Sequence, residues 1–80
     1  MEIIDGIGFI GLTLLLSAFI LNQMKKMTAT SLVYNLMNAV GGYILTYYAI
    51  ALNNIPFTIL ECVWGSVALY RVITYKPDPE

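Results

Sequence analysis

The segment from Pro56 to Thr74 is apolar and long enough to cross a lipid bilayer, yet it carries a carboxylate, Glu61, well inside it. A charged side chain in the hydrocarbon core costs about 3 kcal/mol on insertion scales, so such a residue usually has a partner or a task. Any fold of this chain must therefore place Glu61 where another polar group or a water-filled space can reach it.

Two more apolar segments precede this one, and together they predict three membrane-spanning helices over residues 3–23, 31–52 and 56–75. At about 1.5 Å per residue, each is long enough for the roughly 30 Å of a bilayer core. The connections are short, so we expect an all-α integral membrane protein: a single three-transmembrane-helix bundle over residues 1–80 with sequential antiparallel neighbours. The first segment starts with acidic residues and lacks a cleavage pattern, which indicates a retained helix and not a signal peptide.

The composition excludes several classes of function. Hydrophobic residues make up 59% of the chain and charged residues 11%, whereas about a quarter of residues are charged in a soluble domain. The sequence contains no basic patch that would indicate nucleic-acid binding. It contains no His and a single cysteine, Cys62, so we expect neither a metal ion nor a cofactor. No nucleophile and base occur at a catalytic spacing, so we do not expect an enzyme.

The cationic residues fall at one end of the expected bundle. Lys25 and Lys26 lie in the first loop, and Arg71 and Lys76 lie near the end of the third helix. Because positive residues favour the cytoplasmic side, this pattern predicts an N-outside, C-inside topology. We therefore expect a multi-pass protein of the inner or plasma membrane.

Small residues recur on each expected helix and predict close helix packing. Gly6, Thr13 and Ser17 share one face of the first helix, and we expect this face to meet another helix or a cavity. The G-x-G-x-x-G spacing that begins at Gly6 lies on a membrane helix with no strand before it, so it does not predict a nucleotide site. The other positions that we assign to packing are Gly41, Gly42 and Gly65.

Polar side chains inside the expected helices are candidates for a solute pathway. Glu61 shares a helical face with small residues, and a carboxyl held away from water favours its protonated form, which could carry a proton or hydrogen-bond a polar solute. The competing interpretation is that Glu61 hydrogen-bonds a tyrosine of the second helix, Tyr47 or Tyr48, and only locks the fold. The candidate pathway residues are Glu61, Trp64, Asn38, Ser17 and Tyr47.

Three residues toward the cationic end have simpler interpretations. Tyr34 is typical of an interfacial anchor, and Arg71 is typical of a side chain that snorkels to lipid headgroups. Asn35 is typical of interhelical hydrogen bonding in membrane bundles.

One known family has a matching arrangement of residues. The segment Ser31–Tyr34, then Gly42, Tyr48, Leu52 and Pro56, then a polar residue five positions later, resembles the second half of a bacterial SemiSWEET, the three-helix half-transporter of the PQ-loop (MtN3-like) superfamily. The small three-helix CBU_0592-like membrane domains share this layout and resemble the chain more closely. The resemblance implies a parallel homodimer in which Glu61 stands at the position of a sugar-binding asparagine. Leu45 falls on or near the position of a tryptophan, and the Pro-Gln hinge of the superfamily is absent near Ser17.

We interpret the chain as a SemiSWEET-like homodimer that passes a small polar solute, sugar-like or other, across the bilayer by alternating access. A central cavity would receive Glu61 from each subunit and be lined by Asn38, Ser17 and Trp64. The alternative is a non-transporting membrane module that binds a lipid or a partner membrane protein, with Glu61 as an interhelical lock. A third interpretation is an ion or proton conductor that uses the same acid.

Overall fold

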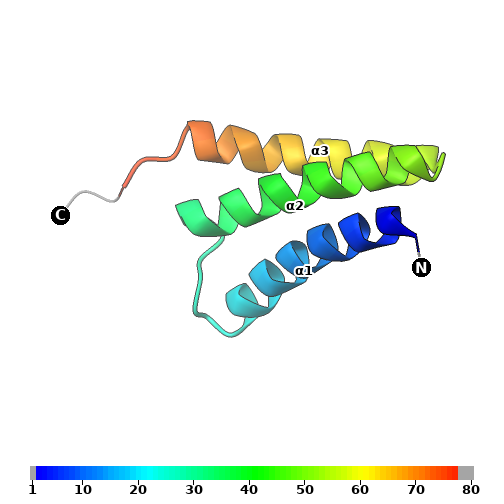
Figure 1. Ribbon diagram of the computed structural model, residues 1–80. Coiled ribbons are helices and arrows are strands. Elements are labelled where there is room, and N and C mark those ends of the chain that lie inside the picture. Colours follow the sequence, from blue (N-terminus) through cyan, green and yellow to red (C-terminus); the bar gives the residue numbers. More distant parts are fainter. Residues whose placement is uncertain (1, 78–80) are drawn as a thin grey trace.

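The computed structural model describes residues 2–77, which form three α-helices and no strand (Figure 1). Helix α1 spans Ile3–Gln23, α2 spans Leu32–Ala51 and α3 spans Ile55–Ile73. Successive helices run antiparallel, so the predicted all-α, three-helix arrangement is confirmed. The observed helix ends differ from the predicted ones by at most two residues.

Polar side chains set the starts of α2 and α3. Ser31 Oγ accepts a hydrogen bond from the Tyr34 amide at 3.1 Å, and Asn54 Oδ1 accepts one from the Phe57 amide at 3.1 Å. These caps satisfy amides that have no partner inside the helix. Asn53 has a φ of 55°, in the left-handed region that asparagine tolerates better than most residues, and this allows the short turn between α2 and α3.

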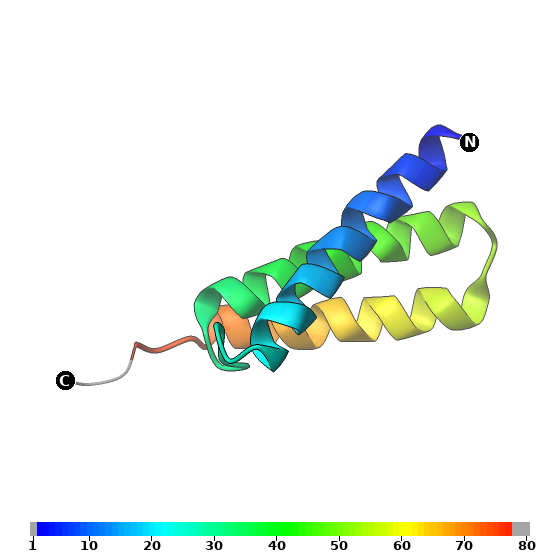
Figure 2. The same ribbon diagram turned by 90° about the horizontal axis from the view of Figure 1, so that it is seen from below.

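Helix α2 lies at the centre of the structure. Within residues 2–77, α1 and α3 each pack against α2, and no Cα atom of α1 lies within 8 Å of a Cα atom of α3. Figures 1 and 2 show α2 and α3 alongside each other over their lengths, while α1 crosses α2 obliquely. The three helices therefore form an open row and not a closed triangle.

The adjacent glycines Gly41 and Gly42 let both neighbours approach α2. Consecutive helical residues point about 100° apart, so each glycine faces a different helix. A methyl group at Gly41 would lie 3.1 Å from the Gly11 carbonyl oxygen of α1, and one at Gly42 would lie 2.8 Å from the Gly65 Cα of α3. Because these are contacts with backbone atoms, no side-chain rotation could relieve them. A side chain at Gly42 would therefore force α2 and α3 apart, and one at Gly41 would need α1 to shift by a few tenths of an ångström.

Helix α1 packs on α2 through Gly8 and Gly11 and not through its Gly6-containing face. A methyl group at Gly8 would lie 2.9 Å from the Tyr48 ring, and one at Gly11 would lie 2.9 Å from the Leu45 side chain. The two glycines provide space for these large side chains of α2, which explains why this face is the one in contact.

The face of Gly6, Thr13 and Ser17 is not packed tightly against another helix at its Gly6 end, where the first of the two alternatives would place a close contact. A methyl group at Gly6 would have no atom within 4 Å, Thr13 is exposed, and Ser17 is half-buried. Thr13 donates its hydroxyl hydrogen to the Phe9 carbonyl oxygen of its own helix at 2.7 Å. This polar group is thus satisfied locally.

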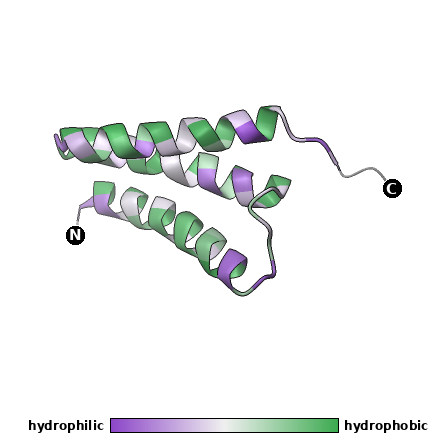
Figure 3. Ribbon diagram, turned by 180° about the vertical axis from the view of Figure 1, so that it is seen from behind, coloured by the Kyte–Doolittle hydropathy of each residue, from purple (hydrophilic) through white to green (hydrophobic). Residues whose placement is uncertain are grey.

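Much of the apolar surface remains outside the core. The accessible surface is 5747 Å², compared with about 4,800 Å² for a soluble monomer of 8.9 kDa. Apolar residues cover the outward faces of the helices (Figure 3). Helices α1 and α3 are long and apolar enough to cross a membrane. Only 17% of the most apolar 18-residue stretch of each helix is buried. These two helices point to association with a membrane.

Candidate functional site

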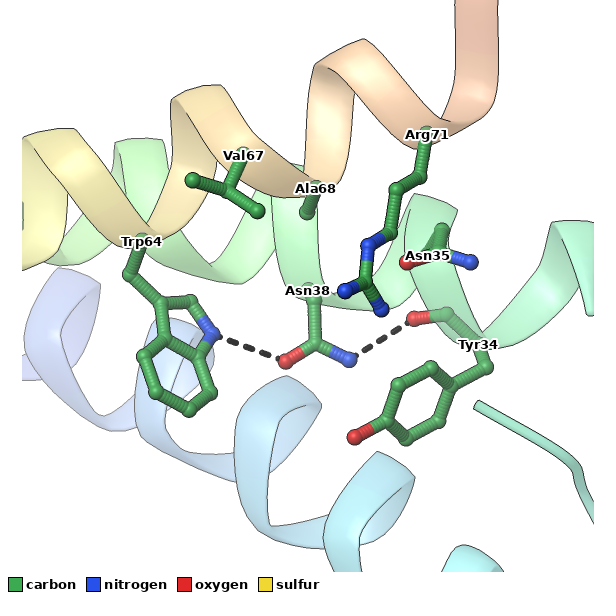
Figure 4. Close-up of a pocket in the computed structure, with 7 residues that line it drawn as sticks. All are labelled: Tyr34, Asn35, Asn38, Trp64, Val67, Ala68 and Arg71. Carbon is green, nitrogen blue, oxygen red and sulfur yellow. Dashed lines mark hydrogen bonds between the residues drawn. The ribbon is translucent and has the colours of Figure 1, made fainter. Parts of the chain in front are cut away.

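A groove lined by both apolar and polar side chains opens between α2 and α3 toward the end of the molecule where the first loop and the last turn of α3 lie (Figure 4). Its volume is about 230 Å³. Residues three and four apart on a helix share a face, and both helices contribute in this way. The lining residues are Tyr34, Asn35, Asn38, Trp64, Val67, Ala68 and Arg71.

A hydrogen-bonded pair, Asn38 and Trp64, links the two helices at one end of this groove. The indole N–H of Trp64 donates to Asn38 Oδ1 at 2.9 Å, and Asn38 Nδ2 donates to the Tyr34 carbonyl oxygen at 2.8 Å (Figure 4). Because both ends of the amide are engaged, its orientation is fixed and the indole is held over the groove. Trp64 remains 51% exposed, so its ring offers an apolar face to a bound molecule.

Asn35 connects the first loop to the start of α2. Its Nδ2 donates to the Ser31 carbonyl oxygen at 2.9 Å and to the Ala29 carbonyl oxygen at 3.1 Å. The side chain is buried, so these bonds offset the desolvation of the amide. Asn35 therefore holds the loop against the mouth of the groove, a role within one helix–loop unit and not the interhelical one expected for it.

Arg71 supplies the positive charge of the groove. Its side chain extends from α3 toward Asn38 and Tyr34 (Figure 4). Among residues 2–77 no carboxylate lies within ion-pair distance of its guanidinium. A guanidinium in this position presents several N–H donors to the space between the helices. The groove thus combines an aromatic face, a fixed amide and a cation.

Glu61 lies outside the groove, in the contact between α2 and α3. Only 7% of its surface is exposed, and its Oε1 atom is buried without a hydrogen-bond partner among the described residues. The nearby tyrosines are engaged elsewhere: the Tyr48 hydroxyl donates to Asp5 Oδ1 at 3.1 Å, and the Tyr43 hydroxyl lies 2.9 Å from Ser66 Oγ. The hydrogen bond from Tyr47 or Tyr48 to Glu61 that the sequence suggested is not formed here.

The structure thus brings together two of the five candidate pathway residues, Trp64 and Asn38. Tyr47 is 59% exposed, and Ser17 lies half-buried on α1, away from the groove. Sequence reasoning did not group Arg71 and Tyr34 with the pair. The sequence contains a pattern that would have grouped Arg71 with Trp64, because the two residues are seven positions apart and so lie two turns apart on one helical face.

A second interhelical pair ties α1 to α2 at the opposite end of the molecule. Tyr48 packs its ring on Gly8 and donates its hydroxyl hydrogen to Asp5. The hydroxyl partner is a carboxylate, which makes this hydrogen bond stronger than one between neutral groups. Asp5 stands near the start of α1, so this contact fixes the N-terminal half of α1 on α2.

Within residues 2–77 no cluster of three or more His, Cys, Asp or Glu side chains could hold a metal ion.

The fold and the site define a small all-helical protein with two helices able to cross a membrane and a groove between α2 and α3. A protein-family model matches residues 4–77, and the chain belongs to the family that this model describes. The match supports the expected resemblance to the small three-helix CBU_0592-like membrane domains. Neither the curated proteins nor the solved structures that were searched contain a match.

Proposed function

We propose that all three helices cross the inner or plasma membrane, with the N-terminus outside and the cationic end in the cytoplasm. Asparagines and tyrosines lower the mean hydropathy of α2, but Asn35 and Asn38 are buried and hydrogen-bonded. The lipid therefore does not have to solvate their amides. Both cationic segments lie at the same end of the antiparallel row (Figure 1), which supports this orientation.

In this membrane, the chain acts as a homodimeric, SemiSWEET-like protein that passes a small polar solute by alternating access. The observation that carries the proposal is the partnerless Oε1 atom of Glu61. A buried polar group without a hydrogen bond costs about 1–3 kcal/mol, and more when charged. A second subunit, or a solute held between two subunits, would supply the missing partner.

The groove supplies further solute contacts in this proposal. The exposed ring of Trp64, held in place by Asn38, and the guanidinium of Arg71 together suit a molecule with both hydroxyl groups and apolar C–H surface. Three helices enclose little space alone, and the row is open, so a closed pathway requires the second copy. Ser17 and Tyr47 contribute to such a pathway only if the partner subunit faces them.

One observation favours the alternative, a non-transporting membrane module that binds a lipid or a partner protein. Gly42 and Gly65 bring α2 and α3 into backbone contact one turn from Glu61, and the acid is absent from the groove lining. Within one subunit Glu61 is buried beside this contact, with 7% of its surface exposed. In that case Glu61 belongs to the interhelical contact and serves as a lock.

Cysteine accessibility separates the two functions. In a Cys62→Ser background, Glu61→Cys is treated with a water-soluble maleimide in liposomes, and the oligomeric state is measured by light scattering. We expect dimers and a reactive thiol at position 61. Val63→Cys, which is 57% exposed on the apolar surface of α3, is the matched lipid-facing control and should not react. Monomers, or a thiol at position 61 as unreactive as the one at 63, would contradict the transporter.

Solute flux tests the function directly. Liposomes that contain the protein are exposed to a hyperosmotic pulse of small polyols and sugars, and the recovery of their volume is followed by light scattering. We expect faster recovery than in empty liposomes for at least one solute, and at least a tenfold loss of that gain in Glu61→Gln. Val63→Ala should retain the gain. No gain for any solute with the folded protein would favour the non-transporting module.

A further inference from the structure

A second cavity lies at the cationic end, beside the groove. Its volume is about 330 Å³, and it shares Asn35 and Arg71 with the groove. Residues from the first loop, from α2 and from the segment that follows α3 meet there. Its remaining lining residues are Thr30, Thr74, Tyr75 and Lys76.

The charge of this cavity is positive over the described residues. Arg71 and Lys76 both line it, and no acidic residue does. The acidic side chains within residues 2–77 are Glu2 and Asp5 at the other end of the molecule and Glu61 in the contact between α2 and α3. No ion pair among these residues neutralises Arg71 or Lys76. The cavity is therefore a place where an anion would be attracted.

The hydrogen-bonding groups of the cavity narrow the class of anion. A guanidinium presents a planar fork of donors that matches the oxygens of a phosphate, and an ammonium adds a point charge. The Thr74 hydroxyl donates to the Tyr70 carbonyl oxygen at 2.9 Å, so the donors that remain for an anion are the two cations and the Thr30 and Tyr75 hydroxyls. The Asn35 amide is already engaged with the loop and shapes the wall.

We propose that this cavity binds a phosphate-bearing anion, with Arg71 and Lys76 as the ligating side chains. The proposal is independent of transport and of Glu61. A phospholipid headgroup and a free phosphate ester share this chemistry. In the proposed membrane placement the cavity lies at the level of the headgroups, where Lys and Arg attract anionic lipids.

Titration of purified protein in a zwitterionic detergent tests the site. The probes are inorganic phosphate, glycerol phosphate, dihexanoyl phosphatidylglycerol and dihexanoyl phosphatidylcholine, and binding is followed by native mass spectrometry and by the fluorescence of the single tryptophan, Trp64. We expect saturable binding of phosphate-bearing anions, weakened at least fivefold in Arg71→Gln and in Lys76→Gln. Binding of phosphatidylglycerol alone would identify the ligand as a headgroup, and binding of glycerol phosphate as well would extend it to free esters.

The matched control is Lys26→Gln, which removes the same charge from the same end of the molecule but from outside the cavity. It should leave binding within a factor of two. Asp78 and Glu80 lie outside the described residues. The double variant Asp78→Asn, Glu80→Gln should bind the phosphate-bearing probes at least as tightly as the parent chain. Equal weakening by Lys26→Gln and Lys76→Gln, or no saturable binding by protein of unchanged helicity, would overturn the proposal.

Discussion

At the scale of single residues, Asn38 and Tyr48, which both form hydrogen bonds between helices, differ from Glu61 in how their polar atoms are satisfied. Asn38 uses both ends of its amide, one within α2 and one across to Trp64. Tyr48 finds a carboxylate on α1. Among residues 2–77, Glu61 has no such partner for Oε1. The first two therefore contribute to the stability of one subunit, whereas Glu61 contributes only once another molecule supplies a hydrogen bond.

The bond between Asn38 and Trp64 can be measured by a double-mutant cycle. Trp64→Phe retains an aromatic ring and removes the N–H donor, and Asn38→Leu removes the acceptor at similar volume. We expect a coupling energy of about 0.6–1.5 kcal/mol in detergent-micelle unfolding. A coupling indistinguishable from zero would mean that the bond does not form in the folded protein.

The two neighbouring tyrosines of α2 give a sharper comparison. Tyr48→Phe removes the hydroxyl that bonds Asp5, so we expect a loss of about 1 kcal/mol in the free energy of unfolding. Tyr47→Phe removes a hydroxyl that is exposed and makes no hydrogen bond within residues 2–77, so we expect almost no loss. The same unfolding assay checks both variants. Equal effects would argue against the contact between Tyr48 and Asp5.

At the scale of the helices, glycine placement determines which faces meet. Gly42 faces Gly65, Gly41 faces Gly11, and Gly8 receives the Tyr48 ring. In a bilayer, helix association depends on this close packing because lipid tails are as apolar as the side chains they replace. The two interfaces are thus held by complementary shapes and a few polar bonds.

Two glycine-to-alanine substitutions should change the free energy of unfolding in opposite directions. Gly42→Ala places a methyl group 2.8 Å from the Gly65 Cα, so α2 and α3 must separate, and we expect a loss of about 1–3 kcal/mol. Gly6→Ala meets no atom within 4 Å and gains helix propensity, so we expect a gain of up to about 1 kcal/mol. Thermal unfolding in detergent measures both. A Gly42→Ala variant as stable as the parent would contradict the close contact.

The helices and their antiparallel order were predictable, while the rotation that brings particular faces together was not. Long apolar segments, Ser31 and the turn around Asn53 mark the ends of helices from local sequence alone. The choice of Gly8 over Gly6 depends on how α1 rotates and crosses α2, which no local pattern contains. The same holds for the site: Asn38 and Trp64 were each recognised as polar groups, but their hydrogen bond spans 26 residues and depends on the rotation of α3 against α2.

At the scale of the whole molecule, charge is segregated along the helix axes. Lys25 and Lys26 lie in the loop after α1, and Arg71 and Lys76 lie at the end of α3, the same end of the row. Glu2 and Asp5 lie at the other end. This separation is what the proposed orientation depends on, and in that orientation the cavity proposed to bind phosphate would face the cytoplasm.

Labelling of intact cells tests that orientation. In the Cys62→Ser background, Leu52→Cys lies in the turn between α2 and α3 and should react with a membrane-impermeant maleimide from outside. Lys26→Cys lies in the first loop and should react only after the membrane is permeabilised. The reverse pattern would invert the topology, and reaction of both from outside would contradict a membrane-spanning α2.

The open row has a thermodynamic consequence. Since the backbones of α1 and α3 stay more than 8 Å apart within residues 2–77, the packing of the molecule resides mainly in the two interfaces of α2, as between the neighbouring units of a repeat protein. Gly8→Ala perturbs the first interface and Gly65→Ala the second, so their effects on unfolding should sum to within about 0.5 kcal/mol in the double variant. Each terminal helix can then detach or re-dock without loosening the other, which makes α2 and one partner the smallest cooperative unit of this chain.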